Sequence, residues 1–184
     1  KFTNNVVKGA EGALNLLGSD NEKPSQRSSG ALIGNNLFTD IRGPFLTLNG
    51  YNNVSLLHNT HFQTGNIMVL YGTPVQQLVY RDNVTIRHAS GYGVFGDSLG
   101  EGVVALRKFA PEVVFKNNVL ALAQGSLYPK DNYFPASIER VGFANFDKGD
   151  YRITSASPYN KASSDGQPVG CDWAKLNFGA KTSE

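Results

Sequence analysis

Tyr80-Arg81-Asp82-Asn83 is the clearest copy of a short motif in which a bulky apolar residue, a spacer and a polar doublet precede another apolar run. The motif recurs at intervals of 23 to 35 residues. Repetition at such a period is typical of solenoids, in which each repeat stacks on the one before it. The other copies are Phe2-Thr3-Asn4-Asn5, Ile33-Gly34-Asn35-Asn36, Leu57-His58-Asn59-Thr60 and Phe115-Lys116-Asn117-Asn118.

Each repeat divides into three short strands, predicted most clearly at residues 65–71, 78–81 and 84–87. The polar doublet falls at the tight turn before the third strand. Asn and Asp are favoured there because they tolerate left-handed backbone and hydrogen-bond nearby peptide groups. Stacking of the turns about 4.8 Å apart predicts a hydrogen-bonded column, made of Asn4, Asn35, Asn59, Asp82 and Asn117.

Alternating side chains predict which residues fill the interior of the coil. Before the turn, the inward row is Phe2, Ile33, Leu57, Tyr80 and Phe115, and the outward row is Thr3, Gly34, His58, Arg81 and Lys116. Alignment of the glycines that close the first strand predicts two further inward rows, Leu16 with Leu48 and Leu70, and Leu14 with Leu46 and Met68. One continuous apolar core follows.

Composition sets limits on size and partners. A chain of 184 residues suits one domain. Its net charge of +2 does not favour a nucleic-acid partner, which normally needs a concentrated basic face. Its apolar runs are far shorter than the roughly 20 residues of a membrane-spanning helix. Cys171 is the one cysteine, so no internal disulfide forms and cysteine usage does not identify the compartment.

These features resemble the right-handed parallel β-helix superfamily, the pectate-lyase-like solenoids, from Phe2 to about Leu122. A closer similarity is to a group of exported β-helix proteins of soil bacteria. The C-terminal ending of the proteins in that group is similar to the segment Ser164 to Asp172 of this chain, although Cys171 stands where a small residue is usual. The other segments that carry this resemblance are residues 34–41, 58–65, 128–135, 149–153 and 157–159.

The expected fold class is therefore all-β, a right-handed single-stranded parallel β-helix of about five rungs with an irregular C-terminal cap. We expect the rungs in residues 1–127 and the cap, part of the same domain, in residues 128–184, where prolines and aromatics replace the repeat. A cap over the last rung would hide unpaired strand edges and core. Its own core is expected to be Phe134, Phe143, Phe146 and Trp173.

The outward row His58, Arg81 and Lys116 is the best charged candidate for a binding site. Arg81 and Lys116 on neighbouring rungs would hold one sugar carboxylate, Arg81 through its bidentate guanidinium. The alternative interpretation, which the sequence favours, is a solvated strand face whose charges discourage edge association. His61 is a candidate metal or acid-base partner of His58, but two histidines without a third ligand do not make a zinc site, and a hydrogen bond at the turn is the simpler expectation.

Aromatic residues offer a second candidate surface. Tyr51, Tyr71 and Tyr92 are expected near the turn after the first strand, where flat rings would stack on sugars; the alternative is packing against inserted loops. Those loops, residues 19–30 and the glycine-rich residues 90–102, are also candidate binding regions.

The leading functional hypothesis is a secreted or cell-surface bacterial module that binds polysaccharide, with catalytic residues unknown. No carboxylate pair for glycoside hydrolysis is evident, because Asp40, Asp97, Glu101 and Glu112 fall on different turns. One alternative is part of a polysaccharide lyase or glycosidase whose active rungs lie upstream of Lys1. Another is a structural stalk that associates through an uncapped first rung or with an upstream fragment. No cofactor or metal is expected; the alternative is calcium at the turns around Asp165, Gly166, Gly170 and Asp172.

Overall fold

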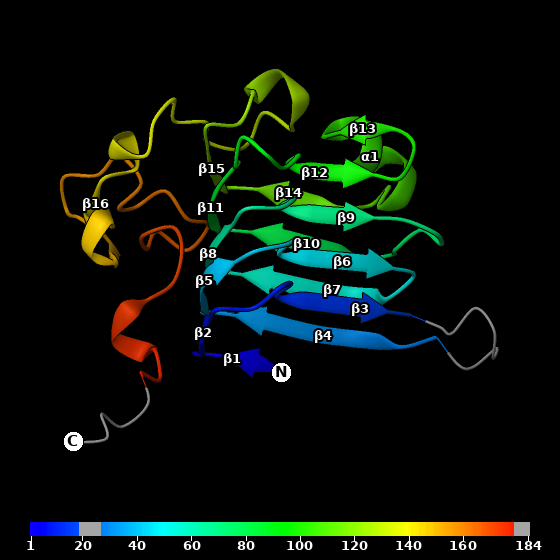
Figure 1. Cartoon of the computed structure of the whole chain (residues 1–184), viewed down its shortest axis with the longest axis horizontal. Helices are drawn as coiled ribbons and strands as arrows, with labels where there is room; N and C mark the ends of the chain where they lie inside the picture. Colours follow the sequence, from blue (N-terminus) through cyan, green and yellow to red (C-terminus); the bar gives the residue numbers. More distant parts are fainter. Residues whose placement is uncertain (19–26, 179–184) are drawn as a thin grey trace.

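The computed structural model describes residues 1–18 and 27–178, so most of the predicted binding loop at 19–30 lies outside the described residues. Within these ranges, three five-stranded sheets form the sides of a coil (Figure 1). Consecutive strands from β1 to β12 belong to the first, second and third sheet in turn, and each pairs in parallel with a strand of the neighbouring turn. β13 folds back and pairs antiparallel with β12 in the third sheet, before β14 and β15 continue the first and second sheets. The chain is all-β, with mostly parallel sheets in an arrangement consistent with a parallel β-solenoid.

Neighbouring strands of each sheet come from successive turns of the coil. The first sheet contains β1 (Phe2–Thr3), β4 (Ser29–Gly34), β7 (Asn52–Leu57), β10 (Leu78–Arg81) and β14 (Val114–Lys116). The second contains β15 (Val119–Ala121), β11 (Val84–Ile86), β8 (Thr60–Gln63), β5 (Leu37–Ile41) and β2 (Val6–Lys8). The third contains β13 (Gly100–Glu101), β12 (Val94–Gly96), β9 (Met68–Leu70), β6 (Leu46–Asn49) and β3 (Leu14–Leu17).

The remaining elements are short. A hairpin forms from β16 (Phe143–Asn145) and β17 (Asp150–Ile153). The helices are α1 (Val103–Phe109) and the 3₁₀ turns η1 (Gly125–Leu127), η2 (Glu139–Val141), η3 (Phe146–Lys148) and η4 (Trp173–Lys175).

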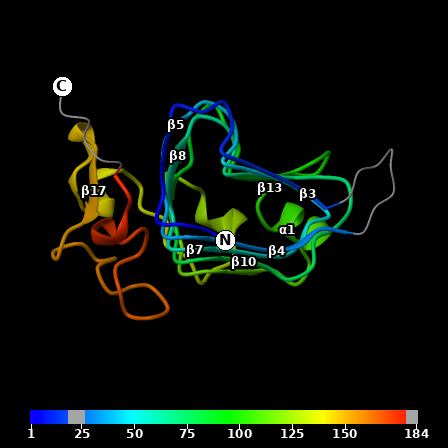
Figure 2. The same cartoon turned by 90° about the horizontal axis from the view of Figure 1, so that it is seen from below.

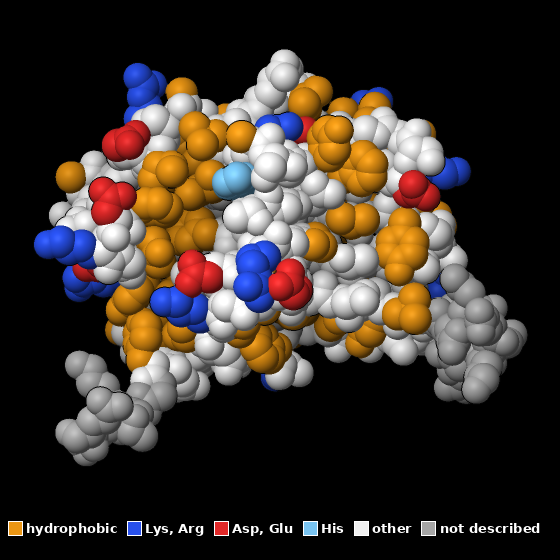
Figure 3. All heavy atoms as spheres, viewed as in Figure 1, with side chains coloured by type: hydrophobic (Ala, Val, Ile, Leu, Met, Phe, Trp, Pro, Cys, Tyr) orange, Lys and Arg blue, Asp and Glu red, His pale blue; other side chains and the backbone are white. Residues whose placement is uncertain are grey.

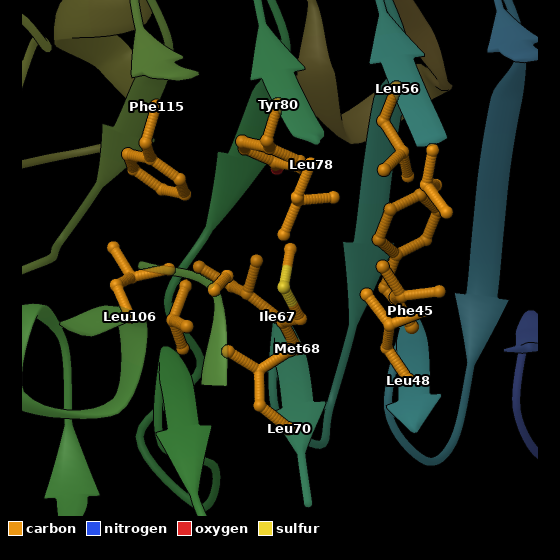
Figure 4. Close-up of a cluster of buried hydrophobic side chains, with 14 of the residues drawn as sticks. Phe45, Leu48, Leu56, Ile67, Met68, Leu70, Leu78, Tyr80, Leu106 and Phe115 are labelled. Atoms are coloured by element: carbon orange, nitrogen blue, oxygen red, sulfur yellow. The ribbon is translucent and has the colours of Figure 1, made fainter. Parts of the chain in front are cut away.

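The core lies between the three sheets. The two predicted inward rows of the third sheet are confirmed. Leu14 pairs with Leu46, which pairs in turn with Met68, and Leu16 pairs with Leu48, which pairs with Leu70. Figure 4 shows the side chains of the first sheet directed toward those of the third. Each fully buried aliphatic side chain of this kind stabilises the fold by about 2 kcal/mol. The residues of this core cluster that Figure 4 labels are Phe45, Leu48, Leu56, Ile67, Met68, Leu70, Leu78, Tyr80, Leu106 and Phe115.

One predicted register is wrong by one residue. Leu56, not Leu57, pairs with the inward Ile33 and Tyr80 and is fully buried. Leu57 therefore belongs to the outward row, beside Gly34 and Arg81, and His58 moves into the turn. The sequence of the third motif is compatible with either register, because Leu56 and Leu57 are both apolar and because the pair Asn59-Thr60 resembles the polar doublet.

The turn column consists of residues in left-handed backbone conformation, which Asn and Asp adopt at least cost. It contains four of the five predicted members, with His58 in the place of Asn59: Asn4, Asn35, His58, Asp82 and Asn117, with φ angles of 63°, 52°, 51°, 61° and 55°. We call this set the left-handed column. Its side chains face outward, toward the C-terminal segment of residues 139–178.

A separate, buried amide ladder lies one residue further along. Each side-chain oxygen accepts from both the backbone N–H and the side-chain amide of the asparagine one turn earlier, at 2.9 to 3.1 Å. The same amides also donate to backbone carbonyls, so the buried side chains have their hydrogen-bond partners. The ladder consists of Asn5, Asn36, Asn59, Asn83, Asn118 and Asn132.

The end of the core beyond β12 is covered by α1 and the residues around η1. Leu106 and Phe109 of α1 are buried in the main cluster, and the ring of Tyr128 stacks on Phe115 with centroids 6.1 Å apart. Most of the residues that cover this end therefore precede residue 128.

Residues 139–178 lie along the flank of the coil and not over its end. Figure 2 shows this segment outside the side formed by β5 and β8. The reason is that the outer face of the second sheet is apolar: Val84 and Val119 pack with Val141 and Val169 in a second core cluster. Parallel sheets are commonly buried on both faces.

An aromatic seam strengthens this junction. Figure 3 shows a band of hydrophobic side chains along the boundary between the C-terminal segment, at the left, and the coil. In this region the ring of Phe62 on β8 lies 5.8 Å from Phe143, 5.3 Å from Phe146 and 4.6 Å from Tyr151. Phe143 and Phe146 thus dock the segment on the coil as well as packing together.

Candidate ligand-binding cleft

A cleft of about 790 Å³ lies between the outer face of the first sheet and the C-terminal segment. This size falls in the range of small-molecule sites, about 300 to 1,000 Å³. Its floor contains the outward row Thr3, Gly34 and Leu57, in which Gly34 leaves the middle position without a side chain. The opposite wall is formed by residues of β17 and of the segment from Asp165 to Lys175.

The left-handed column holds that wall in place. Asp82 accepts from the backbone N–H of Ser164 at 2.8 Å and from its hydroxyl at 2.6 Å. Asn35 accepts from the backbone N–H of Asp172. At the two ends, Asn117 donates to the carbonyl of Ala162, and the carbonyl of Asn4 accepts from the N–H of Asn177.

His58 lies at the corner of the cleft between two carboxylates. Its Nε2 is 3.6 Å from Oδ2 of Asp82 and 3.4 Å from Oδ2 of Asp165. The Asp82 side chain is fully buried and needs partners, which Arg81 and Ser164 provide. The Ser163 hydroxyl lowers the pKa of Asp165 below its ordinary value, with smaller contributions from the Gln167 N–H and His58.

The wall opposite the floor includes η4 and the residue before it, Asp172. Oδ1 of Asp172 accepts from the N–H of Ala174 at 3.1 Å, and its Oδ2 lies 2.9 Å from Nζ of Lys175. This ion pair lowers the pKa of Asp172 and raises that of Lys175. The indole of Trp173 packs 4.9 Å from Phe178 and lines the cleft.

Cys171 also lines the cleft but is not set up as a nucleophile. Its backbone N–H donates to Oγ1 of Thr60 at 3.0 Å. Burial raises the pKa of the thiol to about 11. The thiol is therefore protonated near neutral pH, and the thiolate is the reactive form.

Of the six residues predicted for a sugar site, only His58 lines this cleft. The predicted charged row is not formed, because Leu57 takes the place of His58 beside Arg81. Arg81 and Lys116 are paired neighbours as predicted, but the guanidinium of Arg81 contacts Asp82, with Nε 3.1 Å from Oδ2.

The three predicted tyrosines do not gather at one place. Tyr71 follows β9, whereas Tyr92 precedes the paired strand β12, so the two lie toward opposite ends of the third sheet. Tyr92 is 55% exposed and stacks on Phe95 at 5.2 Å. Tyr51 packs against the core cluster and donates from its hydroxyl to the Ser29 carbonyl.

His61 is a core residue and does not face His58. Its ring stacks on Phe45 at 3.6 Å, Nδ1 donates to Gln63 and Nε2 accepts from the Tyr80 hydroxyl at 2.6 Å. Burial lowers the pKa of His61 to about 3. Two of its neighbours thus fix one neutral tautomer.

Two other findings bear on the predicted partners. Within residues 1–18 and 27–178, no group of three or more His, Cys, Asp and Glu side chains is arranged to hold a metal ion. In the same part of the chain, no helix combines the length and apolar character needed to cross a bilayer.

The wall of the cleft comes from the aperiodic C-terminal part of the chain. Trp173 was expected in the core of a cap, and Asp165 and Asp172 at tight turns, with calcium binding there as the alternative. The useful signal was the left-handed column itself, because outward polar side chains at successive turns invite a second segment to dock. No family model, curated protein or solved structure matches the chain.

Proposed function

We propose that the chain is a right-handed parallel β-helix module of about five rungs, related to the pectate-lyase-like solenoids, that binds polysaccharide at the surface of a bacterium or outside it. The observation that carries the proposal is the cleft, in which Trp173 lies among polar and charged side chains. An aromatic face combines apolar area with a polar edge, which suits a sugar ring.

The elongated floor supports a polymer as ligand. Thr3, Gly34 and Leu57 are aligned across three neighbouring strands, so a chain of sugars lying along the row meets a continuous surface about 10 Å long at strand spacing. A rigid scaffold that presents a site between a sheet face and a docked segment is typical of binding modules.

Two variants test the location. Trp173→Ala removes the aromatic face, and Gly34→Phe fills the floor; a Cβ at Gly34 meets its nearest atom at 3.6 Å, an ordinary contact. Affinity electrophoresis in gels containing polysaccharides should show retardation of the unaltered protein and its loss in both variants. Gly34→Ala and Tyr92→Ala are the matched controls and should still be retarded. Absence of retardation on every polysaccharide, or retardation lost only in Tyr92→Ala, contradicts the proposal.

A carbohydrate-active enzyme is the second candidate, favoured by His58. Its imidazole lines the cleft, and its Nε2 lies within 3.6 Å of two carboxylates that can orient it. Histidine is the side chain most often used for proton transfer. Release of new reducing ends or unsaturated sugars, abolished by His58→Asn, would support a glycosidase or a lyase. Binding without any product supports the module.

An association surface is a third proposal. β1, β2 and β3 are the last strands of their sheets, and Phe2 is 37% and Leu17 45% exposed. Unpaired strand edges with apolar side chains favour pairing with another chain. Sedimentation that is independent of concentration would exclude self-association through this edge.

A further inference from the structure

The basic side chains of the cleft already contact carboxylates of the protein. Among the described residues that line it, the basic side chains are His58, Arg152 and Lys175. His58 lies between Asp82 and Asp165, and Lys175 pairs with Asp172.

Arg152 makes the most extensive of these contacts. The guanidinium of Arg152 contacts both oxygens of Asp150, with Nε 2.8 Å from Oδ1. This fork geometry is the one that Arg uses to hold a ligand carboxylate. Since Asp150 occupies this edge of the guanidinium, a uronate at Arg152 meets only the remaining N–H groups and lies beside the like charge of Asp150.

The carboxylates that line the cleft are accessible to solvent, as are their neighbours Arg152 and Lys175, whose side chains are 60% and 70% exposed. The side chains of Asp165 and Asp172 are 56% and 47% exposed. Carboxylate oxygens accept strongly from hydroxyl groups and repel a second carboxylate. A ligand with many hydroxyls therefore finds acceptors here, while an anionic sugar meets like charge.

Apolar side chains in the cleft also favour an uncharged ligand. Leu57 on the floor and Ile153 and Trp173 on the wall present uncharged area to the ligand. We infer that the cleft selects uncharged polysaccharides over uronate polymers. This inference rests on the proposed function and names its ligand class, and it replaces the predicted uronate grip by Arg81 and Lys116.

Calorimetric titration with hexasaccharides of three charge classes tests it. The probes are neutral gluco-, xylo-, manno- and galacto-hexaoses, hexagalacturonate as the anion, and the chitosan hexamer as the cation. The expected result is binding of at least one neutral probe about tenfold or more tighter than hexagalacturonate. Tighter binding of hexagalacturonate or of the chitosan hexamer overturns the inference while the proposed function stands. Failure of all probes overturns both.

Charge variants make the test independent of the sugar stereochemistry. Asp172→Asn keeps an acceptor for the Ala174 N–H but releases Lys175, so the ratio of hexagalacturonate to neutral affinity should rise about fivefold. Lys175→Gln should lower that ratio. Asp97→Asn, an exposed carboxylate beyond β12, is the matched control and should leave the ratio unchanged. An unchanged ratio in both Asp172→Asn and Lys175→Gln also overturns the inference.

Discussion

The buried carboxylate of Asp82 accepts two hydrogen bonds from Ser164, a residue 82 positions away in the chain, one from the backbone N–H and one from the hydroxyl. This contact joins the left-handed column of the coil to the C-terminal segment. It orders the wall of the cleft together with the Asn35–Asp172 hydrogen bond and the apolar packing of Val84 and Val119.

Asp82→Asn is therefore expected to loosen the C-terminal segment. An amide offers one acceptor oxygen in place of two and no charge for Arg81 and His58, a loss of about 1 to 2 kcal/mol. Hydrogen exchange followed by mass spectrometry should show amides of residues 162–178 exchanging about tenfold faster or more, with the core strands unchanged. Asp97→Asn serves as control; equal exchange in the two variants would show that Asp82 does not hold the segment.

The register of the third turn predicts opposite behaviour for two adjacent leucines. Leu56 is fully buried, so Leu56→Ala should lower the free energy of unfolding by about 2 to 5 kcal/mol. Leu57 is on the outer face, and Leu57→Ala should cost less than about 1 kcal/mol. Denaturant titration of both variants measures this, and the reverse order of costs would restore the register first expected from the sequence.

The amide ladder predicts a large effect at its middle. Asn59→Ala leaves the N–H of Asn36 without its acceptor and the oxygen of Asn83 with one donor fewer, all in the buried interior. Loss of these partners should cost about 2 to 4 kcal/mol. Asn15→Ala, at an exposed position of β3, is the control and should change stability by less than about 0.5 kcal/mol. Similar thermal midpoints for the two would contradict the ladder's structural role.

The depressed pKa of His61, about 3 in the folded chain against 6.5 for the free side chain, predicts acid destabilisation. Below pH 6.5 the unfolded chain takes up a proton that the folded chain excludes, so His61 opposes folding increasingly from pH 6.5 down to about 3. The slope is about 1 kcal/mol per pH unit. Between about pH 6.5 and 5, above the range in which most carboxylates titrate, this slope should disappear in His61→Gln. The slope should persist in His88→Gln, which removes an exposed imidazole. Loss of the slope in His88→Gln but not in His61→Gln would show that His61 does not cause it.

The repeat predicted the strands, the inward rows of the third sheet and most of the left-handed column, because each depends on local side-chain alternation and turn chemistry. The slip at Leu57 arose where two leucines and an Asn-Thr pair made adjacent registers equally consistent with the pattern. The pairing of Leu56 with Ile33 and Tyr80 decides between them, and pairing is not visible within a single repeat.

α1 was missed for a different reason. It spans seven residues directly after the glycine-rich stretch, and its buried residues Ala105, Leu106 and Phe109 are too few to show a helical period. It forms because those side chains cover the end of the core, which is a tertiary effect.

The candidate site was the least predictable part. Its floor comes from the repeat, but Trp173, Asp165 and Asp172 come from a segment without periodicity, and its docking depends on contacts across more than 80 residues. Besides the left-handed column, the apolar residues Val84 and Val119 on the outer face of the second sheet were a signal that a segment would cover this flank.

An NMR titration of the isotopically labelled chain with the neutral hexasaccharide that binds best tests the central claim most directly. If the sugar lies in the cleft, the indole N–H signal of Trp173 and the methyl signals of Leu57 shift together, with one dissociation constant, while the ring signals of Tyr51, Tyr71 and Tyr92 stay in place. Shifts confined to those tyrosines, or no shift at Trp173 and Leu57 with a saturating amount of sugar, would contradict it.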